Sequence, residues 1–309
     1  MKNIKIISEV ETEGKQVLVR ADLEVEAGES GQRFLAAKEI VSYLESKGAG
    51  RIKVIGHEGR EWVAEQLGVE TIRDIREDPR EEENSEQMAR ELAEGFDIYV
   101  NEAFATSHRR HTSICALPEV MANQEKEVCI GLRFAKEMEM LSQVLNKPGR
   151  KLLAVSGIKV KDKLGYAVRL APRFDKVILG GRIPAEYSKY DYKIPNNFML
   201  AKLREDMLDL DEGTIEMFKS EIEKADVIVV AGVMGKFEDP AAEKGTKEIM
   251  TAIANNGRAY KVLGGGDGES AIVKYGLRDK FDWVSVGGGA MLEFLAAGTL
   301  VGLEAVKTS

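Results

Sequence analysis

Two triple-glycine turns late in the chain carry the clearest chemical signal in the sequence. They are Gly264-Gly265-Gly266-Asp267 and Gly287-Gly288-Gly289-Ala290, and each lies between a β-like run and a helix-like run. Such a turn directs bare backbone N–H groups and the positive end of a helix toward an anion. Two of them in one sheet suggest a polyphosphate or a transferring phosphoryl group.

Cationic and imidazole side chains recur in the first half of the chain, at predicted strand ends and in the loops after them. This basic cluster comprises Arg20, Arg33, His57, Arg60, Arg76, Arg109 and His111. If the sheet is parallel, the strand ends share one edge and these side chains converge. Several guanidinium groups together suit phosphate or carboxylate, because each planar fork donates to two oxygens. For a single arginine, a solvated surface position is the commoner outcome.

The histidines allow a second interpretation. All 3 of them, His57, His108 and His111, fall in two of these loops and could be metal ligands. The interleaved arginines would repel a cation, so the pattern favours an anion site.

Other loops hold further candidates. Lys159 and Lys163 follow a predicted strand at a helix start, where lysine meets a phosphoryl group or is simply solvated. Glu238 follows another strand, after a glycine turn. Asp267 could serve Mg²⁺ on nucleotide phosphates or cap a helix, and these two roles are compatible. The GxxxxGK[ST] loop of P-loop kinases is absent from the sequence, and no serine or cysteine triad has credible spacing.

Composition and charge exclude several functional classes of protein. The chain has 309 residues, enough for two domains, and a net charge of −8, which argues against a general nucleic-acid binder. No apolar run could span a membrane, and the first residues lack a signal-peptide core. Cys115 and Cys129 lack metal-like spacing, which indicates reduced thiols. We expect a soluble cytoplasmic α/β protein.

Short β-branched runs alternate with amphipathic helices and must position these groups. The predicted strands are 16–21, 51–55, 98–101, 151–155, 176–179, 226–230, 259–263 and 283–286. The predicted helices include 34–46, 86–94, 134–145, 162–170, 214–224 and 241–254. This βαβ alternation predicts parallel sheets with helices on both faces. Asn146-Lys147-Pro148-Gly149 marks a domain boundary, and the stretch 182–197 is expected to be an irregular loop.

These motifs, taken in order, resemble the phosphoglycerate kinase family from about Val17 to about Ala305. In the first half, Val17–Asp22 is similar to the family's first strand motif, and Gly56–Arg60 resembles its SHLGRP motif. Arg33 and Arg76 match family arginines. The segment Tyr99–His111 is close to YVNDAFGTAHRAH, a long and specific match.

The second half continues the resemblance. Ser156–Lys163 resembles GGAKVSDK, and Val233–Glu238 resembles PMGVFE. The two triple-glycine turns fall where the family has its own. The departures are Glu24 for asparagine, Ala231 and Val233 for the asparagine and proline of NGPMG, Gly268 for serine or threonine, and Val286 for threonine. The chain is also shorter than ordinary members, mainly between Leu179 and Leu208.

The resemblance implies two doubly wound, Rossmann-like domains. The first domain, which would bind the triose phosphate, would comprise residues 1–133 and the C-terminal segment 296–309. A hinge helix at 134–150 would connect it to a shortened nucleotide-binding domain at 151–295. It also implies reversible phosphoryl transfer between 1,3-bisphosphoglycerate with MgADP and 3-phosphoglycerate with MgATP, in glycolysis and gluconeogenesis. The expected binding partners are these small-molecule substrates, without nucleic acid or membrane. The expected oligomeric state is a monomer.

The resemblance assigns roles residue by residue. It implies triose-phosphate binding by Asp22, Glu24, Arg33, His57, Arg60, Arg76, Arg109 and His111. It implies catalytic roles for Arg33, Lys159, Gly266, Gly288 and Gly289. It implies nucleotide binding by Gly157, Lys159, Lys163, Gly181, Gly232, Glu238, Gly264, Gly265, Gly266, Asp267 and Gly268, with Asp267 serving Mg²⁺ through the phosphates.

Two alternatives stay open at this point. The altered residues around the nucleotide could mark a non-catalytic binding protein that keeps the triose site and has weak or lost nucleotide binding. Glu24, a negative charge near an anionic ligand, could instead indicate a kinase for another small phosphorylated acid.

Overall fold

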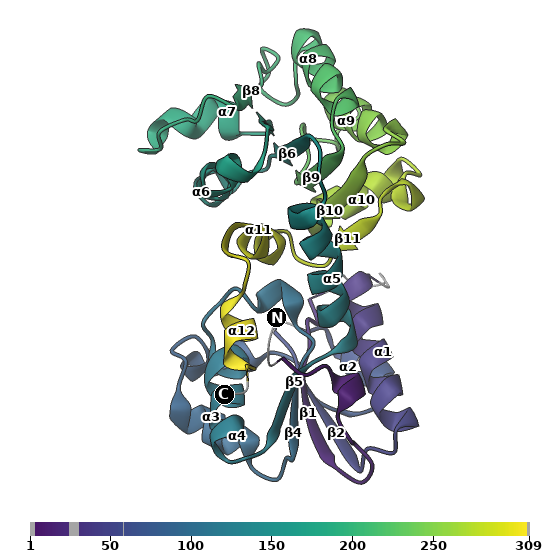
Figure 1. The fold of residues 1–309 in the computed structure, drawn as a ribbon, viewed down its shortest axis with the longest axis vertical. Helices are drawn as coiled ribbons and strands as arrows, with labels where there is room; N and C mark the ends of the chain where they lie inside the picture. Colours follow the sequence, from purple (N-terminus) through teal and green to yellow (C-terminus); the bar gives the residue numbers. More distant parts are fainter. Residues whose placement is uncertain (1–3, 25–30, 58, 308–309) are drawn as a thin grey trace. The chain divides into compact units, whose positions relative to one another are not determined.

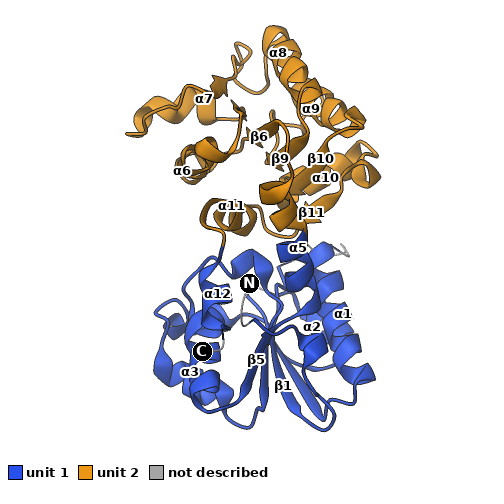
Figure 2. Cartoon of the chain, viewed as in Figure 1, with its two compact units in different colours: residues 1–139, 299–309 blue, residues 140–298 orange. Residues whose placement is uncertain are grey.

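The computed structural model describes residues 4–24, 31–57 and 59–307. The chain forms two compact units, residues 1–139 with 299–309 and residues 140–298 (Figure 2). We call them unit 1 and unit 2. Each contains one parallel sheet with helices on both faces, which confirms the predicted fold class.

Unit 1 is built on a sheet whose strand order is β3-β2-β1-β4-β5. Its strands are β1 (Gln16–Arg20), β2 (Arg51–Ile55), β3 (Glu70–Ile72), β4 (Ile98–Asn101) and β5 (Glu127–Ile130). The central strand β1 is buried over four successive residues, because helices cover both faces and leave no polar side to the strand.

The helices of unit 1 lie in two layers. They are α1 (Gln32–Ser46), α2 (Glu61–Leu67), α3 (Glu86–Ala93), α4 (Leu117–Asn123), the first part of α5 (Leu132–Asn146) and α12 (Val301–Ala305). Figure 1 shows α1 and α2 on one side of the sheet and α3, α4 and α12 on the other. Phe34, Ile40 and Leu44 of α1 pack on Val17 and Val19 of β1, which makes one half of the core.

Unit 2 contains a sheet whose strand order is β11-β10-β9-β6-β7-β8. Its strands are β6 (Lys151–Val155), β7 (Lys176–Leu179), β8 (Phe198–Leu200), β9 (Val227–Ala231), β10 (Tyr260–Gly264) and β11 (Trp283–Ser285). All five pairings between neighbouring strands are parallel.

The helices of unit 2 also cover both faces of the sheet. They are α6 (Val160–Leu170), α7 (Ile183–Glu186), α8 (Glu212–Glu223), α9 (Lys244–Asn255), α10 (Gly266–Lys274) and α11 (Gly288–Ala297). The helices α8 and α9 pack together on one face, and α6 contacts α11. Phe218 of α8 and Ile249 of α9 enter the same core cluster as Ile228 of β9.

Every predicted strand and helix is present, with ends shifted by a few residues. The predicted elements did not include β3, β5, β8, α2, α4, α7 and α12. These are short, and three-residue strands such as β3 and β8 show no usable alternation. The stretch 182–197, expected to be irregular, contains α7 and the single turn Tyr187–Lys189 before β8.

The boundary between the units falls inside a helix. The units divide after Glu139, within α5, and again after Gly298. The expectation from the sequence was a hinge helix at 134–150 and a C-terminal segment that rejoins the first domain from residue 296. The helix α5 ends at Asn146, just before Pro148-Gly149. The hinge role of this segment stays a prediction.

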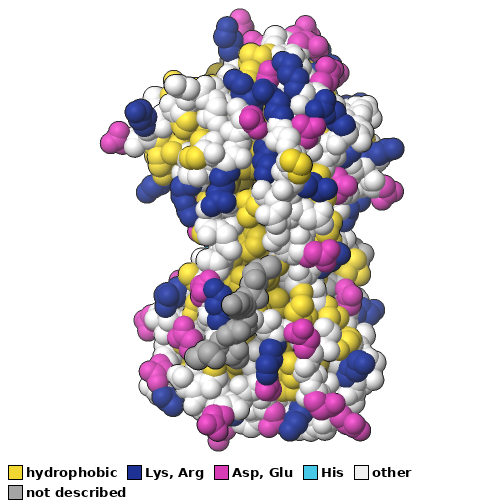
Figure 3. Space-filling model, in the orientation of Figure 1, with side chains coloured by type: hydrophobic (Ala, Val, Ile, Leu, Met, Phe, Trp, Pro, Cys, Tyr) yellow, Lys and Arg dark blue, Asp and Glu magenta, His cyan; other side chains and the backbone are white. Residues whose placement is uncertain are grey.

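Among the described residues, no helix combines the length and apolar character needed to cross a bilayer. Lys and Arg are interspersed with Asp and Glu on the face shown in Figure 3. Cys115 and Cys129 are both free and buried.

Truncating Phe218 should destabilise unit 2. The Phe218 side chain is fully buried, so Phe218→Ala leaves a cavity and should lower the free energy of unfolding by about 3–5 kcal/mol. Urea unfolding followed by circular dichroism measures this change. The neighbouring Met217 is 40% exposed, and Met217→Ala is the matched control, with an expected change of about 0.5 kcal/mol or less. Equal losses in both variants contradict the described core.

Candidate active site

In unit 1, the predicted basic cluster forms at the carboxyl edge of the sheet. Arg20, at the end of β1, is level with Ile55 of β2 and Asn101 of β4. The segments after these three strands therefore begin side by side. They carry Asp22 and Glu24, His57, and the loop that leads to Arg109 and His111.

His57 lies at the centre of the cluster, next to Arg109, Glu24 and His111. Its Nε2 lies 3.1 Å from Nη1 of Arg109 and 3.5 Å from Oε1 of Glu24. The other carboxylate oxygen of Glu24 accepts from Nη1 of Arg33. The His57 and His111 rings lie 5.8 Å apart between centroids. The structure therefore brings together Glu24, Arg33, His57, Arg109 and His111.

Burial and the neighbouring arginines both disfavour protonation of the imidazoles in the cluster. Burial, followed by the charges of Arg20, Arg76 and Arg109, lowers the pKa of His57 to about 3. Burial also lowers the pKa of His111. Both imidazoles are thus neutral near pH 7. Because a guanidinium can only donate, Nε2 of His57 accepts from Arg109 and the ring proton is on Nδ1. Excess positive charge of this kind favours an anionic ligand.

Asp22 and Arg60, two residues predicted to bind the triose phosphate, have surroundings that differ from those of the residues around His57. The Asp22 side chain is buried, and its two oxygens accept from the backbone N–H of Ala105 at 2.7 Å and the hydroxyl of Thr106 at 3.0 Å. Asp22 therefore anchors the loop that leads to Arg109. Arg60 is exposed at the start of α2, and among the described residues it has no hydrogen bond or ion pair that joins it to the cluster.

A buried hydrogen-bond network lies next to the cluster, and it was not predicted from the sequence. Nε of the fully buried Arg20 donates to Oγ of Ser113 at 2.9 Å, and that hydroxyl donates to Oε1 of Glu81 at 2.5 Å. The same Glu81 oxygen lies 3.8 Å from Nδ1 of His111. Glu81 opens the run Glu81-Glu82-Glu83, which is typical of a solvated surface, so its burial leaves no signal in the sequence.

Glu102 links the same loop to the start of α5. The Glu102 carboxylate is buried and accepts from the backbone N–H groups of Arg133 at 2.8 Å and Phe134 at 3.2 Å. A Cβ at Gly131 would lie 2.0 Å from Oε2 of Glu102, so this close approach needs glycine. Burial outweighs the two hydrogen bonds and raises the pKa of Glu102 to about 8.

In unit 2, the glycine turns also share the carboxyl edge of the sheet. The residue pairs Val155–Ala231, Ala231–Gly264 and Gly264–Ser285 are level across β6, β9, β10 and β11. The loops after these strands carry Gly157, Gly232, Gly264–Gly266 and Gly287–Gly289. The sequence-based expectation of a common edge is therefore correct.

The two triple-glycine turns touch each other. A Cβ at Gly288 would lie 2.9 Å from the carbonyl oxygen of Gly264, so both turns depend on bare backbone. They start α10 at Gly266 and α11 at Gly288, so the first N–H groups of both helices begin at this edge. Gly232 has a φ of +108°, and a Cβ there would lie 2.3 Å from the Ser156 carbonyl oxygen.

Charged groups flank these turns. Burial lowers the pKa of Lys163, Asp267 opposes that shift and Lys159 adds to it, so these three charges act on one another. Gly181 approaches closely too, since a Cβ there would lie 2.7 Å from the Gly157 nitrogen. Glu238 is exposed on the loop between β9 and α9.

The departure at Gly268 has a packing reason. A Cβ at this position would lie 3.1 Å from a methyl group of Leu263. Glycine therefore lets α10 pack closely on β10, and a serine or threonine there would need Leu263 to move.

Metal ligands are sparse. Among the described residues, no group of three or more His, Cys, Asp or Glu side chains could hold a metal ion, so the histidine-metal interpretation finds no support. Asp267, in the first turn of α10, can supply a single carboxylate. One carboxylate together with phosphate oxygens and waters is a typical Mg²⁺ environment, so this residue fits a nucleotide-borne ion.

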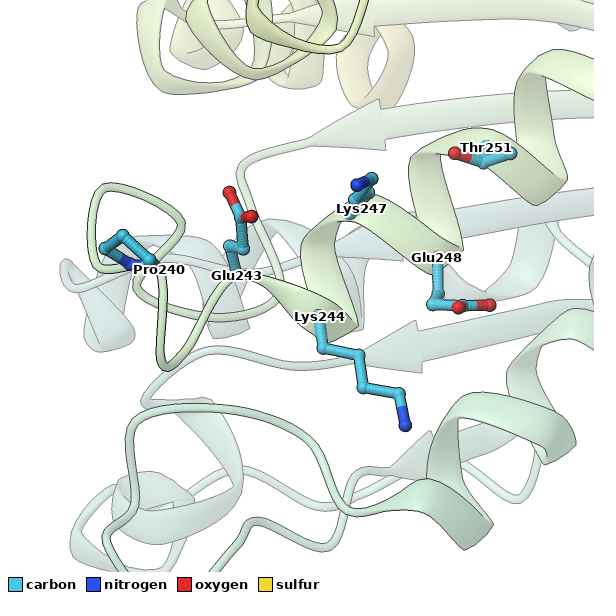
Figure 4. Close-up of a pocket in the computed structure, with 6 residues that line it drawn as sticks. All are labelled: Pro240, Glu243, Lys244, Lys247, Glu248 and Thr251. Carbon is cyan, nitrogen blue, oxygen red and sulfur yellow. The ribbon is translucent and has the colours of Figure 1, made fainter.

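A separate hollow lies along α9. It is lined by Pro240, Glu243, Lys244, Lys247, Glu248 and Thr251 (Figure 4). None of these belongs to the predicted site. Lys244 is paired with Glu212, Glu243 with Lys274 and Glu248 with Lys219, so most of the charged side chains here already have protein partners.

Comparisons with known proteins decide the family. A family model described as phosphoglycerate kinase matches residues 64–205 and 191–298. The phosphoglycerate kinase of Acidobacterium capsulatum is 32% identical over 284 residues, which cover 76% of this chain and 69% of that protein. This chain belongs to the phosphoglycerate kinase family. The predicted resemblance and enzyme class, a phosphotransferase, are thereby confirmed.

Other phosphoglycerate kinases match along the whole chain. That of Dictyoglomus turgidum is 29% identical over 397 aligned positions, which cover 99% of both proteins. That alignment includes residues before 64, which the family model leaves unmatched. The crystal structure of the phosphoglycerate kinase from Pyrococcus horikoshii OT3 has a TM-score of 0.79 at 24% identity and covers 98% of both chains. The structure from Coxiella burnetii gives 0.78 at 24%, also over 98% of both chains.

The chain is a short member of the phosphoglycerate kinase family. An alignment of 397 positions exceeds its 309 residues, so the relative has residues at many positions where this chain has none. The predicted shortening is therefore confirmed.

Replacing Glu102 should change how stability depends on pH. Its folded-state pKa of about 8 lies above the ordinary 4.5, so the folded protein keeps a proton that the unfolded chain releases. Wild-type stability should therefore fall as the pH rises through this window. Glu102→Gln keeps an acceptor for the backbone N–H groups and should lose less stability between about pH 5 and pH 8.

Urea unfolding at both pH values measures the difference. Glu119→Gln, at an exposed position of α4, is the matched control and should behave like the wild type. Parallel pH profiles for Glu102→Gln and the wild type would contradict the raised pKa.

Proposed function

We propose that this chain catalyses reversible phosphoryl transfer between 1,3-bisphosphoglycerate with MgADP and 3-phosphoglycerate with MgATP, in glycolysis and gluconeogenesis. The observation that carries the proposal is that each unit gathers groups suited to an anion at the carboxyl edge of its sheet. Unit 1 offers the basic cluster and unit 2 offers the glycine turns. Family membership makes this pair of anions a triose phosphate and a nucleotide.

In unit 1, the proposed role of the chain is to bind and orient the triose phosphate. Arg33, His57 and Arg109, with Arg76, Arg60 and His111, supply donors for carboxylate and phosphate oxygens. The neutral His57 binds as a hydrogen-bonding group and not as a charge, because burial, together with the neighbouring arginines, lowers its pKa to about 3. Asp22 keeps the loop before Arg109 in place through Ala105 and Thr106.

In unit 2, the proposed role is to bind the nucleotide phosphates. The glycine turns present N–H groups that are fixed before the ligand arrives, which is how charge is stabilised in phosphoryl transfer. Lys159 and Lys163 add positive charge, and Glu238 is proposed for the ribose. Asp267 would hold Mg²⁺ through the nucleotide phosphates, and such an ion neutralises charge on the phosphates when bound. Transfer requires the two substrates to meet, so we propose a hinge at 134–150.

A coupled assay with 3-phosphoglycerate and MgATP tests the activity. Turnover that is abolished by EDTA and restored by Mg²⁺ is expected. Absence of turnover in both reaction directions would overturn the proposal. If calorimetry then showed 3-phosphoglycerate binding without ATP binding, the chain would be a non-catalytic binding protein. The comparisons favour the enzyme over that alternative.

Arg109→Ala should raise the KM for 3-phosphoglycerate. It removes a charge-assisted donor worth about 1.5–3 kcal/mol, so an increase of roughly 10- to 100-fold is expected. The adjacent Arg110 is also exposed and provides the control, and Arg110→Ala should leave the KM unchanged. Similar effects of both substitutions would indicate general electrostatic attraction and not a specific contact.

Lys163→Ala should weaken nucleotide binding. Lys163 is flanked by Asp267 and Lys159, and loss of its charge should raise the Kd for ADP roughly 10- to 100-fold by calorimetry. Lys161, exposed on the same helix, is the matched control. Unchanged ADP affinity in Lys163→Ala would remove this residue from the nucleotide site.

A further inference from the structure

Glu24 is an acidic side chain inside a cluster that otherwise suits anions. One of its oxygens accepts from Nη1 of Arg33, and the other lies 3.5 Å from Nε2 of His57. The same His57 nitrogen contacts Arg109. The carboxylate of Glu24 therefore occupies positions next to two of the groups proposed to hold the substrate.

The surroundings show what holds Glu24 there. Its side chain is 26% exposed and that of Arg33 is 27% exposed, so the pair lies at the edge of the cluster and within reach of a ligand. Burial, and after it the charge of Asp22, raises the pKa of Glu24, while Arg33, Arg20 and Arg109 lower it. The arginines thus keep in place a carboxylate that burial disfavours.

Asp22, another acidic side chain at this edge, behaves differently. Asp22 directs its two oxygens to Ala105 and Thr106 and so has partners outside the basic cluster. Glu24 instead accepts from Arg33, a member of the basic cluster. A carboxylate or phosphate that takes the Nη1 donor of Arg33 must displace Glu24 from it, because one N–H cannot serve two acceptors equally well.

We propose that Glu24 is a specificity-determining residue that competes with the anionic ligand for Arg33 and must be displaced when the ligand binds. This inference rests on the proposed function, because it concerns the same triose-phosphate site. A ligand with two anionic groups can replace Glu24 at Arg33 and still engage the rest of the cluster. A small ligand with one anionic group, such as inorganic phosphate, makes fewer contacts with the cluster after displacing Glu24, so its binding is disfavoured. Glu24 therefore lowers affinity in general and sharpens the preference for a small acid with two separate anionic groups.

Calorimetry without nucleotide tests this competition, with 3-phosphoglycerate and inorganic phosphate as separate probes. Glu24→Gln keeps the size of the side chain and removes the charge. It should bind both probes more tightly, by roughly two- to tenfold, with the larger gain for phosphate. Glu45→Gln, at an exposed position of α1, is the matched control and should match the wild type. Equal or weaker binding by Glu24→Gln overturns the inference, since weaker binding would make Glu24 a direct ligand of the substrate.

A double-mutant cycle separates competition from a structural effect. In an Arg33→Ala background, Glu24→Gln should no longer tighten binding, because the contested group is gone. An undiminished gain there overturns the inference. Thermal unfolding of each variant verifies that it is folded, and Glu24→Asn replaces Glu24→Gln if the latter is not.

The binding readout also keeps the two proposals distinct. A chain without turnover whose Glu24→Gln variant binds 3-phosphoglycerate more tightly contradicts the proposed activity and supports the competition. If no variant binds 3-phosphoglycerate, the proposed function fails, and the phosphate titration alone decides the role of Glu24.

Discussion

The parallel direction of all strands in each sheet is the constraint on which the rest of the structure depends. Parallel pairing forces each connection to cross back over the sheet, so the segments that follow the strands all begin at the same edge. In unit 1 this places residues as distant in sequence as Glu24 and Arg109 around one imidazole. In unit 2 it places two triple-glycine turns in contact.

The two edges are proposed to bind anions through different kinds of groups. Unit 1 gathers full charges and must then support them, which it does with the buried chain of hydrogen bonds from Arg20 through Ser113 to Glu81. Unit 2 relies on peptide dipoles, which are neutral overall and need no counterions in the core. The first arrangement can be adjusted by exchanging side chains, as Glu24 shows, whereas the second is set by the path of the backbone.

The sequence predicted what depends on local pattern and order along the chain. Strands such as Lys151–Val155 and the glycine turns were recognisable because apolar runs and Gly-Gly-Gly stand out locally, and parallel pairing then placed them at one edge. What it did not reveal depends on tertiary surroundings. Glu81 reads as part of an acidic surface run yet is fully buried, and β3 and β8 are held by pairing and not by their own propensity. Arg60 matches a motif but lies apart from the cluster contacts, because the course of a long side chain depends on its neighbours.

The contact between Gly264 and Gly288 limits the routes by which such a site can diverge during evolution. Main-chain groups are the same for all residues, so mutation cannot change their chemistry and can only remove the glycine that exposes them. Variation is then confined to positions at the margins of the turns, where one replacement leaves the bare backbone intact. Gly268 and Val286, which differ from the family pattern, occupy such marginal positions, while the glycines of both turns are retained. A lineage that shortens or retunes this domain would be expected to accumulate its changes around the turns long before it alters them.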